Sequence, residues 1–286
     1  MATGATEFVD ATIGNSVFIP DVWTKKMTIA REKKLNCFKC VRSDYGEDLK
    51  VGRRALIPTI GNMASRAKSE NTAITYETIA ETTTTLTINA DKYAAFGIET
   101  IVELQESVSL REAYRSKLGY ALALQVDTDI AALVAGFTQN VGTLNVDPID
   151  DNWLRALQYL DDADALEEGR YIWVSPAAKS GLLKMDKLSR VEYIGDRPAE
   201  GMPTISGILP MRIYGADVMV STNTTADSSG HDCAFLQSES IGAVLQMSPE
   251  FHVWFDPDFL TWKIVAEEIY GVIEVRDDHG VWVKAK

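Results

Sequence analysis

Cysteine, histidine and long apolar runs are all scarce in this chain of 286 residues. Its three cysteines cannot form a disulfide framework, and an odd number of thiols is typical of a reducing compartment. No stretch approaches the roughly 18 consecutive apolar residues that a membrane-spanning helix requires. The segment Met1 to Glu7 contains no basic region followed by an apolar stretch, so we expect no secretory signal. These absences predict a protein that is made in the cytosol and does not enter a membrane.

The chain also has fewer basic residues than acidic residues. The chain has 28 Lys and Arg residues against 41 Asp and Glu residues, for a net charge of −13. Such a chain offers no basic surface for reading a nucleic-acid sequence or for binding phosphates tightly. The charge is equally compatible with enclosing nucleic acid without adhering to it and with simple solubility.

The sequence lacks the common catalytic and phosphate-binding motifs. It contains no GxSxG nucleophile elbow, no GxGxxG loop and no GxxxxGK[ST] loop. Ser65-Arg66-Ala67-Lys68 matches an SxxK pattern by coincidence, because it lies in a predicted flexible tip and its companion motifs are absent. Acidic pairs such as Asp150-Asp151 and Asp161-Asp162 are typical of solvated turns and helix faces, and nothing ties two pairs to one cleft. We therefore expect no catalytic residue and no cofactor.

Cys37 and Cys40 form a CxxC pair, which is a weak signal when it stands alone. Together with His231 and Cys233 they can supply four side chains of the types that zinc accepts. The spacing of the second pair is wrong for the usual finger, and the two pairs lie far apart in the chain. A thioredoxin-like redox site is also disfavoured, since no βαβ pattern surrounds the motif. We favour buried free thiols, and the sequence leaves open whether the four side chains meet.

The most distinctive segment is an arm that runs from Val51 to Asn89. It begins apolar at Ala55–Pro58, is polar from Gly61 to Thr78, and returns through the threonine-rich run Thr82–Ile88. This alternation of branched residues predicts the two half-exposed strands of a hairpin. Such a hairpin buries too little apolar surface to be stable alone in water. No other part of the sequence is suited to cover it, so we expect another copy of the chain to do so.

A single long helix is predicted from Leu110 to Ala135. Ser109 and Glu112 form a capping box at its start, and Gly136 predicts a left-handed stop at its end. At 1.5 Å per residue the helix is roughly 40 Å long. No helix of similar length follows it, so we expect a spine that lies across a sheet rather than a coiled coil. Apolar residues recur along it at three-to-four-residue spacing, namely Leu110, Tyr114, Leu118, Leu122, Val126, Ile130 and Val134.

Residues 148–235 predict a compact α/β unit inserted into the chain. An amphipathic pattern from Trp153 to Leu166 predicts a helix, and Tyr171–Val174 predicts a short buried strand. Ser175-Pro176 opens a second helix, and the composition of Asn223–Asp232 indicates a loop.

The C-terminal part is rich in strands. Phe251–Phe255 alternates, Asp256–Asp258 predicts a turn, and Trp262–Val275 predicts a long strand. A second turn at Asp278–Gly280 leads into Val281–Val283. We expect these strands to lie under the long helix and to close the first domain, which gives an α+β fold.

Two further segments are candidates for contacts between copies of the chain. An apolar patch in the first 35 residues has no matching partner nearby, so it either docks on another surface or packs on its own domain. The tip of the arm carries charges that can pair with a neighbouring copy, although such charges usually mark a solvated loop. A tip of this length without secondary structure is uncommon unless it has a function. The candidate contact residues are Phe18, Trp23, Arg66, Lys68 and Glu70.

Five segments carry a resemblance that spans nearly the whole chain: Arg54–Gly61, Thr87–Ile98, Trp173–Pro176, Tyr214–Ser221 and Tyr270–Val272. They occur in the order of docking arm, extended hairpin, lone spine helix, inserted α/β block and closing strands. In this order the chain resembles the major capsid proteins of tailed bacteriophages with the HK97-type fold.

The resemblance implies an HK97-like capsid fold with four parts. Residues 1–50 would form an N-terminal arm, and residues 51–90 the extended hairpin called the E-loop. Residues 91–147 and 236–286 would form the peripheral domain with the long spine helix. Residues 148–235 would form the axial domain around the capsomer centre.

The resemblance also implies a function without catalysis. The chain would assemble into hexamers and pentamers of an icosahedral shell that encloses double-stranded DNA without sequence specificity. Because the N-terminal arm is short, a separate scaffolding protein is implied, together with a portal protein. The subunit would assemble in the host cytoplasm and belong to the virion. Some members crosslink through a lysine–asparagine bond, but nothing in the sequence supports such a use of Lys68.

Two alternatives stay open at this point. An encapsulin-like shell protein of a cellular nanocompartment shares the fold but encloses cargo enzymes instead of a genome. A soluble enzyme with its cleft in the 148–235 block belongs to a different class, and it would form discrete monomers or dimers instead of shells.

Overall fold

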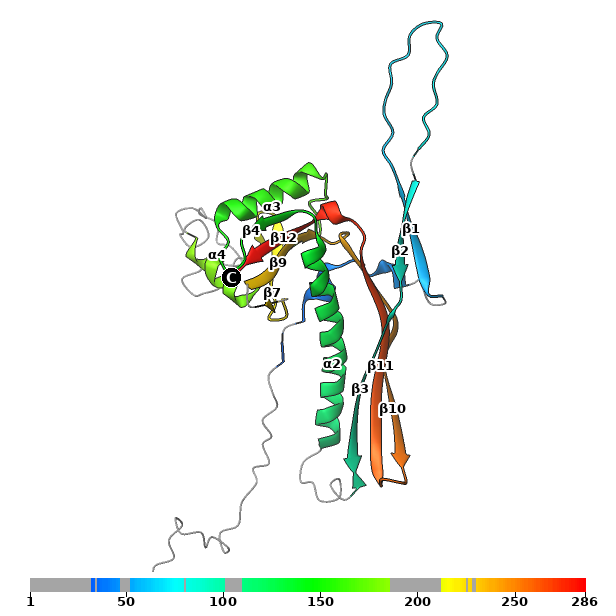
Figure 1. Ribbon diagram of the computed structural model, residues 1–286, viewed down its shortest axis with the longest axis vertical. Coiled ribbons are helices and arrows are strands. Elements are labelled where there is room, and N and C mark those ends of the chain that lie inside the picture. Colours follow the sequence, from blue (N-terminus) through cyan, green and yellow to red (C-terminus); the bar gives the residue numbers. More distant parts are fainter. Residues whose placement is uncertain are drawn as a thin grey trace, which may run out of the picture.

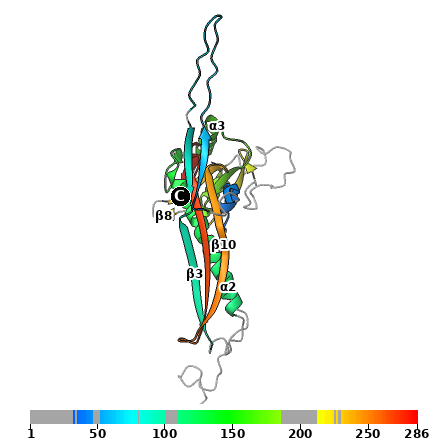
Figure 2. The ribbon, with the colours of Figure 1, turned by 90° about the vertical axis from the view of Figure 1, so that its right-hand side faces the viewer.

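The computed structural model describes residues 32–33, 35–46, 52–79, 81–100, 110–185, 212–224, 226–227 and 230–286. Three parts are distinct in Figure 1, and we name them the arm, the stem and the head. The arm is the hairpin within residues 52–89, the stem is a three-stranded sheet with the long helix α2, and the head is a seven-stranded sheet with two shorter helices. Seen after a 90° turn in Figure 2, the arm and the stem follow one long axis.

The stem is built on a long antiparallel sheet. Its strands are β3 (Ala90–Glu99), β10 (Ile241–Asp256) and β11 (Thr261–Glu274), in the order β10-β11-β3. Helix α2 (Leu110–Leu133) lies along one face of this sheet. Leu118 and Leu122 are buried there against Ile264 and Ala266. The predicted spine across a sheet is therefore present, and it stabilises the stem by removing the apolar stripe of the helix from water.

The C-terminal end of α2 differs from the expectation. Gly136 is absent from the described glycines with positive φ, so the predicted left-handed stop is wrong. The chain instead tightens into the 3-10 turn η4 (Val134–Gly136), where the Phe137 amide donates to the Val134 carbonyl at 3.3 Å. Ser109 of the predicted capping box lies outside the described residues.

Helix α2 also satisfies one criterion for a membrane span. The segment Glu112–Gly136 is long and apolar enough by length and composition alone. The core helix of a soluble protein passes the same test, and the apolar stripe of α2 is covered by the sheet.

The head contains a sheet of mixed strand directions in the order β4-β12-β9-β5-β7-β6, with β8 paired to β9. Strand β12 was expected under the long helix, and this expectation is wrong because Val281 and Val283 are buried in the core of the head. The predicted loop at Asn223–Asp232 is also partly wrong, since it contains β8 and the start of β9. The strands are β4 (Asn140–Gly142), β5 (Arg170–Val174), β6 (Arg212–Ile213), β7 (Ala216–Val220), β8 (Ala226–Asp227), β9 (Gly230–Gln237) and β12 (Gly280–Ala285).

Two helices complete the head. Helix α3 (Asp150–Asp162) buries Trp153 and Leu160 completely, whereas Leu166, predicted to belong to this helix, lies beyond its end and is exposed. Helix α4 (Pro176–Lys184) begins as predicted, with the Ser175 hydroxyl accepting a hydrogen bond from the Ala178 amide at 3.0 Å. The head thus draws β4 and β12 from outside the predicted 148–235 block.

The arm has a packed root and a bare tip. Strands β1 (Arg54–Ile60) and β2 (Glu81–Thr87) pair antiparallel from Arg54↔Thr87 to Ile60↔Glu81. At the root, Leu86 and Ile88 are buried with Val244 of the stem. The expectation that nothing in this chain covers the arm is therefore wrong at the root. From residue 58 to residue 79, every side chain is exposed, so the rest of the described chain leaves the tip uncovered.

Glu268 offers a test of how the stem is stabilised. It is 3% exposed on the face of β11 that α2 covers, and its Oε2 has no hydrogen-bond partner among the described residues. Burial raises the pKa of this carboxyl group, because desolvation disfavours its charged form. We expect Glu268→Met to raise the free energy of unfolding at pH 7 by about 1 kcal/mol. The measurement is chemical denaturation of the unassembled protein.

The matched control is Glu267→Met. Glu267 lies on the opposite face of the same strand, and its ion pair with His252 at 3.3 Å is solvent-exposed, so its replacement is expected to change stability little. A loss of stability in Glu268→Met alone would show that this carboxyl group has a partner that stabilises the stem.

Candidate assembly surfaces

The four side chains weighed as possible zinc ligands do not come together in the structure. Cys37 and Cys40 belong to the core beside α2, whereas Cys233 belongs to the core of the head. His231 instead forms a 3.2 Å hydrogen bond through Nδ1 with the Thr224 hydroxyl. Among the described residues, no three His, Cys, Asp or Glu side chains are grouped so as to hold a metal ion.

The three cysteines are buried free thiols, as predicted. Desolvation by burial raises the pKa of Cys40 to about 12 and that of Cys233 to about 11, and it raises the pKa of Cys37 as well. At neutral pH these groups therefore stay protonated, which makes them poor nucleophiles.

A buried carboxylate anchors the N-terminal part of the described chain. Asp127 of α2 is 2% exposed and accepts a hydrogen bond from the Cys37 amide at 2.7 Å. Its second oxygen accepts one from Asn223 Nδ2 at 3.3 Å. Asn36 Nδ2 donates to the Val220 carbonyl at 3.3 Å, so the segment around η2 (Cys37–Cys40) is fixed between α2 and the head. Sequence reasoning missed this anchor, although an aspartate beside the apolar stripe of a helix was the available signal.

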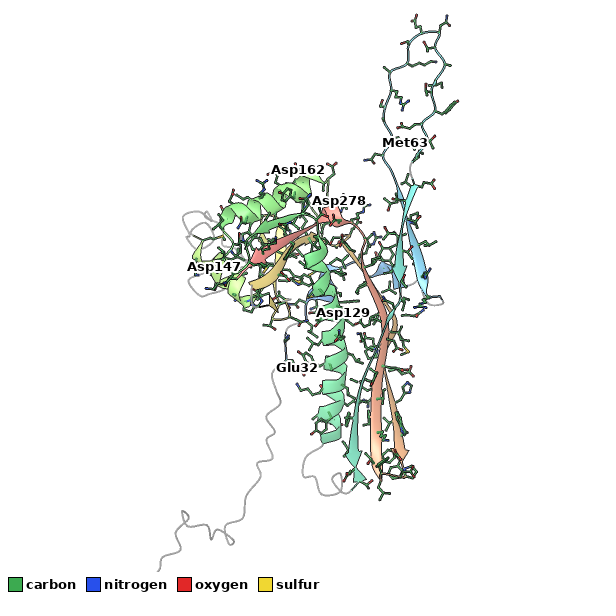
Figure 3. All side chains as sticks on the ribbon, in the orientation of Figure 1. Glu32, Met63, Asp129, Asp147, Asp162 and Asp278 are labelled. Carbon is green, nitrogen blue, oxygen red and sulfur yellow. The ribbon has the colours of Figure 1, made fainter. Side chains whose placement is uncertain are left out.

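The residues just before this anchor in the sequence lie beside helix α2. The Lys33 amide donates to the Tyr120 hydroxyl at 2.8 Å, and Lys117 pairs with Glu32 at 2.7 Å. Figure 3 shows Glu32 beside the stem, below the head. Phe18 and Trp23 lie outside the described residues, so their contact with another copy stays a prediction.

The charged residues of the arm tip have different surroundings. Arg66 pairs with Glu77 across the two legs of the hairpin at 3.7 Å, and Glu77 also accepts a hydrogen bond from the Ala64 amide at 3.3 Å. Within the described residues, Lys68 and Glu70 form no ion pair. All of these side chains are solvent-exposed, where a single pair contributes little to stability. The predicted role of Arg66, Lys68 and Glu70 in contacts between copies stays a prediction.

The arm exposes an unusual amount of apolar surface. Tyr76 is 88% exposed, and Met63, labelled in Figure 3, is 69% exposed. Residues 61–79 contain no strand, so most of their backbone donors and acceptors are open to water. A long extended segment with bare apolar side chains is typical of a surface that a partner completes. The other large exposed apolar residues of the arm are Leu56, Ile60, Ile74 and Ile79.

A second apolar surface lies at the opposite end of the molecule, where β10 turns into β11. Phe259 is 71% exposed at this turn, and the Lys263 ammonium lies 5.2 Å from the centre of its ring. Lys263 also forms an ion pair with Asp256. The neighbouring exposed residues are Val253, Trp254, Phe255 and Leu260. The two apolar surfaces therefore lie at the two ends of the long axis.

A hollow of about 420 Å³ lies at the root of the arm. Arg42 lines it and is shared between Asp44 at 3.2 Å and Glu239 at 3.4 Å, so its charge is already neutralised. Among the described residues that line the hollow there is no Ser, Cys or His side chain. All of its lining residues lie outside the 148–235 block, which is where the alternative of a soluble enzyme places its cleft. The remaining lining residues are Tyr45, Ile57, Pro58, Thr59, Ile60, Val275 and Arg276.

The chain matches the model of one known protein family. The family model described as phage capsid protein matches residues 109–284. No curated protein matches the sequence.

The solved structures that resemble this chain cover nearly all of it. A structure from Mycobacterium phage Che8 has 23% sequence identity and a TM-score of 0.80, covering 93% of this chain and 97% of that chain. The capsid of the cyanophage P-SCSP1u has 16% identity and a TM-score of 0.75, covering 95% and 94%. The capsid of the native GTA particle has 11% identity and a TM-score of 0.69, covering 96% and 98%. These likenesses confirm the HK97-like fold that the sequence predicted.

The anchor at Asp127 can be tested by substitution. In Asp127→Asn the charge that accepts the Cys37 amide is lost, and we expect a loss of about 2 kcal/mol in the free energy of unfolding. We also expect faster hydrogen exchange of the amides from 36 to 41, measured by mass spectrometry. Asp164→Asn is the control, because Asp164 is exposed in a left-handed turn that asparagine also adopts. Unchanged exchange in Asp127→Asn would contradict the role of this carboxylate.

Proposed function

This chain belongs to the phage capsid protein family, and from that premise we propose that it assembles into hexamers and pentamers of an icosahedral shell around double-stranded DNA. It is a capsid protein with an HK97-like fold and a structural component of the virion. The observation that supports assembly most directly is the arm, whose side chains are all exposed from residue 58 to residue 79.

The physical reason lies in the free energy of the bare arm. Apolar side chains such as Ile74 and Tyr76 favour association because it removes them from water. The arm points away from the head and the stem, so neither of these described parts of its own chain covers the tip. A neighbouring subunit can cover it, and the same subunit then extends its own arm to the next. Repetition of this contact produces a closed ring.

The parts of the chain take the following roles in this proposal. Residues 1–50 act as the N-terminal arm and residues 51–90 as the E-loop. Residues 91–147 and 236–286 act as the peripheral domain, and residues 148–235 as the axial domain near the capsomer centre. Strands β4 and β12 complete the sheet of the axial part even though they belong to the peripheral ranges.

The negative net charge of the chain is compatible with a shell that encloses DNA. A net charge of −13 disfavours adhesion to phosphates, so a genome held inside the shell can be released. The shell would hold DNA without sequence specificity. A separate scaffolding protein and a portal protein are the further partners of this proposal, and assembly takes place in the host cytoplasm.

Assembly through the arm makes a direct prediction. The double variant Ile74→Ser with Tyr76→Ser removes apolar side chains that are 64% and 88% exposed and belong to no core of the described residues. We expect the circular dichroism spectrum and the thermal midpoint of the protomer to stay unchanged. We expect the mass of the assembled species, measured by light scattering, to fall to that of single subunits.

The matched control carries Thr75→Ser and Thr78→Ser on the same leg of the arm, and it is expected to assemble like the unmodified chain. Normal shells from the Ile74 and Tyr76 variant would refute assembly through the arm. Electron microscopy with nuclease digestion then identifies the contents. Protected DNA supports the viral shell, and protein cargo without DNA supports a nanocompartment instead.

A further inference from the structure

The stem and the head are joined at one junction. Among the described residues, three chain connections cross it: from α2 through η4 to β4, from β9 to β10 at 238–240, and from β11 through η6 (Asp277–His279) to β12. Figure 1 shows these crossings gathered at the upper end of α2, where the head meets the stem. Any change in the angle between the two parts must deform this junction.

The crossings are tied by backbone hydrogen bonds. The amides of Val275 and Arg276 both donate to the Ser240 carbonyl, at 2.8 and 3.2 Å. The approach is close enough that a Cβ on Gly280 would lie 2.4 Å from ring carbons of Phe137. The junction is therefore tightly fitted, and small changes in the groups that it buries have a large effect.

Two carboxyl groups meet inside this junction. Glu274 is the last residue of β11, and its Oε2 lies 3.3 Å from the position that a Cβ on Gly136 would occupy. Asp277 begins η6 and accepts a hydrogen bond from the Thr138 amide at 2.7 Å. Glu274 and Asp277 also form a hydrogen bond with each other. The pair thus connects the end of β11, the end of α2 and the turn that leads into the head.

The two carboxyl groups hold different protonation states. Burial, together with the hydrogen bond and the charge of Asp277, raises the pKa of Glu274 to about 7. Burial alone would raise the pKa of Asp277, but hydrogen bonds from Thr138 and Glu274 outweigh it and lower that pKa. Glu274 is therefore the protonated donor and Asp277 the ionised acceptor.

The other charged groups near the junction do not neutralise Glu274. Arg276, Asp278 and His279 lie on the same connection as Asp277, and Glu239 lies in the turn between β9 and β10, where it pairs with Arg42. His279 is buried, and burial lowers its pKa, so it is neutral near pH 7. The η4 turn and the following residues 137–139 contribute no charged side chain. Both identified influences on Glu274, burial and Asp277, favour its protonated form.

We propose that Glu274 and Asp277 form a proton-dependent latch between the stem and the head. The latch is closed while Glu274 carries a proton and donates a hydrogen bond to the Asp277 carboxylate. When Glu274 loses this proton, two carboxylates face each other in a partly buried site and repel, and the junction loosens. This inference goes beyond the shell function, because the latch belongs to the single protomer.

The direction of the pH effect follows from linkage. The pKa of Glu274 rises from 4.5 in the unfolded chain to about 7 in the folded one. Between these values the folded chain holds a proton that the unfolded chain has released, so stability falls as the pH rises. The contribution of the latch is complete below the unfolded pKa and is lost above the folded pKa.

In a shell, the latch would control how freely the angle between the head and the stem can change. Subunits in hexamers and pentamers meet their neighbours at different angles, and the angle between the head and the stem is one way to accommodate the difference. A junction that stiffens as the pH falls below about 7 would make the shell more rigid in acid than in alkali.

The test uses the full-length unassembled chain and the variant Glu274→Gln. The amide keeps the size and the donor but cannot ionise. Hydrogen exchange of residues 134–142 and 275–282 is measured from pH 5.5 to 8.5 and corrected for intrinsic rates. In the unmodified chain we expect protection to fall at least tenfold between pH 5.5 and pH 7 and to level off above pH 7, because each pH unit below the folded pKa changes the opening equilibrium by up to a factor of ten. In Glu274→Gln we expect the same protection at every pH.

Two further variants make the test decisive. Glu268→Gln removes another buried carboxyl group of β11 that lies outside the junction, and it is expected to keep the fall in protection. Asp277→Asn removes the neighbouring charge, so the fall is expected to move to a lower pH. Constant protection in the unmodified chain, or an unmoved midpoint in Asp277→Asn, would overturn the latch. Because no shell is formed in these measurements, their outcome is independent of the capsid proposal.

Discussion

The core around the upper half of α2 is the constraint on which the rest of the structure depends. Val126 and Ile130 pack there with Tyr270 of the stem, Trp173 of the head and Cys37 of the N-terminal segment. One buried cluster therefore holds the stem, the head and the N-terminal segment against one another. Without it the stem and the head would be linked only by their three crossings, and neither the direction of the arm nor the fit of the junction would be defined.

The root of the arm is held in place by a close contact between backbones. A Cβ on Gly271 would lie 2.6 Å from the Thr87 carbonyl oxygen and 3.1 Å from the Ile88 Cα. Glycine at this position lets the end of β2 lie directly on β11, where Leu86 and Ile88 become buried. The root is thus rigid while the tip is bare. A rigid root directs the tip toward one place on a neighbour and reduces the entropy that is lost on binding.

Local patterns in the sequence predicted the elements that bury one face along their own length. The spacing of Leu118, Leu122, Val126 and Ile130 predicted α2, and the alternation near Phe251 predicted the β10–β11 hairpin. The tip of the arm has no regular structure and no core, as its composition predicts, but it is less polar than predicted, since Met63, Ile74 and Tyr76 expose apolar side chains there.

The errors concern pairings between distant segments, which local patterns do not encode. Val281 to Val283 was correctly seen as a strand, but its neighbours β4 and β9 are far away in the chain, so its place in the head could not be inferred. The stop at Gly136 was misjudged for a similar reason. The backbone at Gly136 is not left-handed, and a Cβ there would come within 3.3 Å of the carboxyl end of Glu274, a residue on another strand. The anchor at Asp127 likewise depends on partners from two distant segments.

The exposed ends of the molecule explain why a chain with an ordinary composition is incomplete as a single subunit. Hydrophobic residues make up 46% of the sequence, yet aromatic and aliphatic side chains at the arm tip and at the β10–β11 turn stay in water. Folding the arm back would require bending at its rigid root and would break the contacts of Leu86 and Ile88. Association avoids this cost, because it covers the same surfaces without changing the fold. The geometry that prevents the arm from reaching its own body is therefore the geometry that favours its binding to another copy.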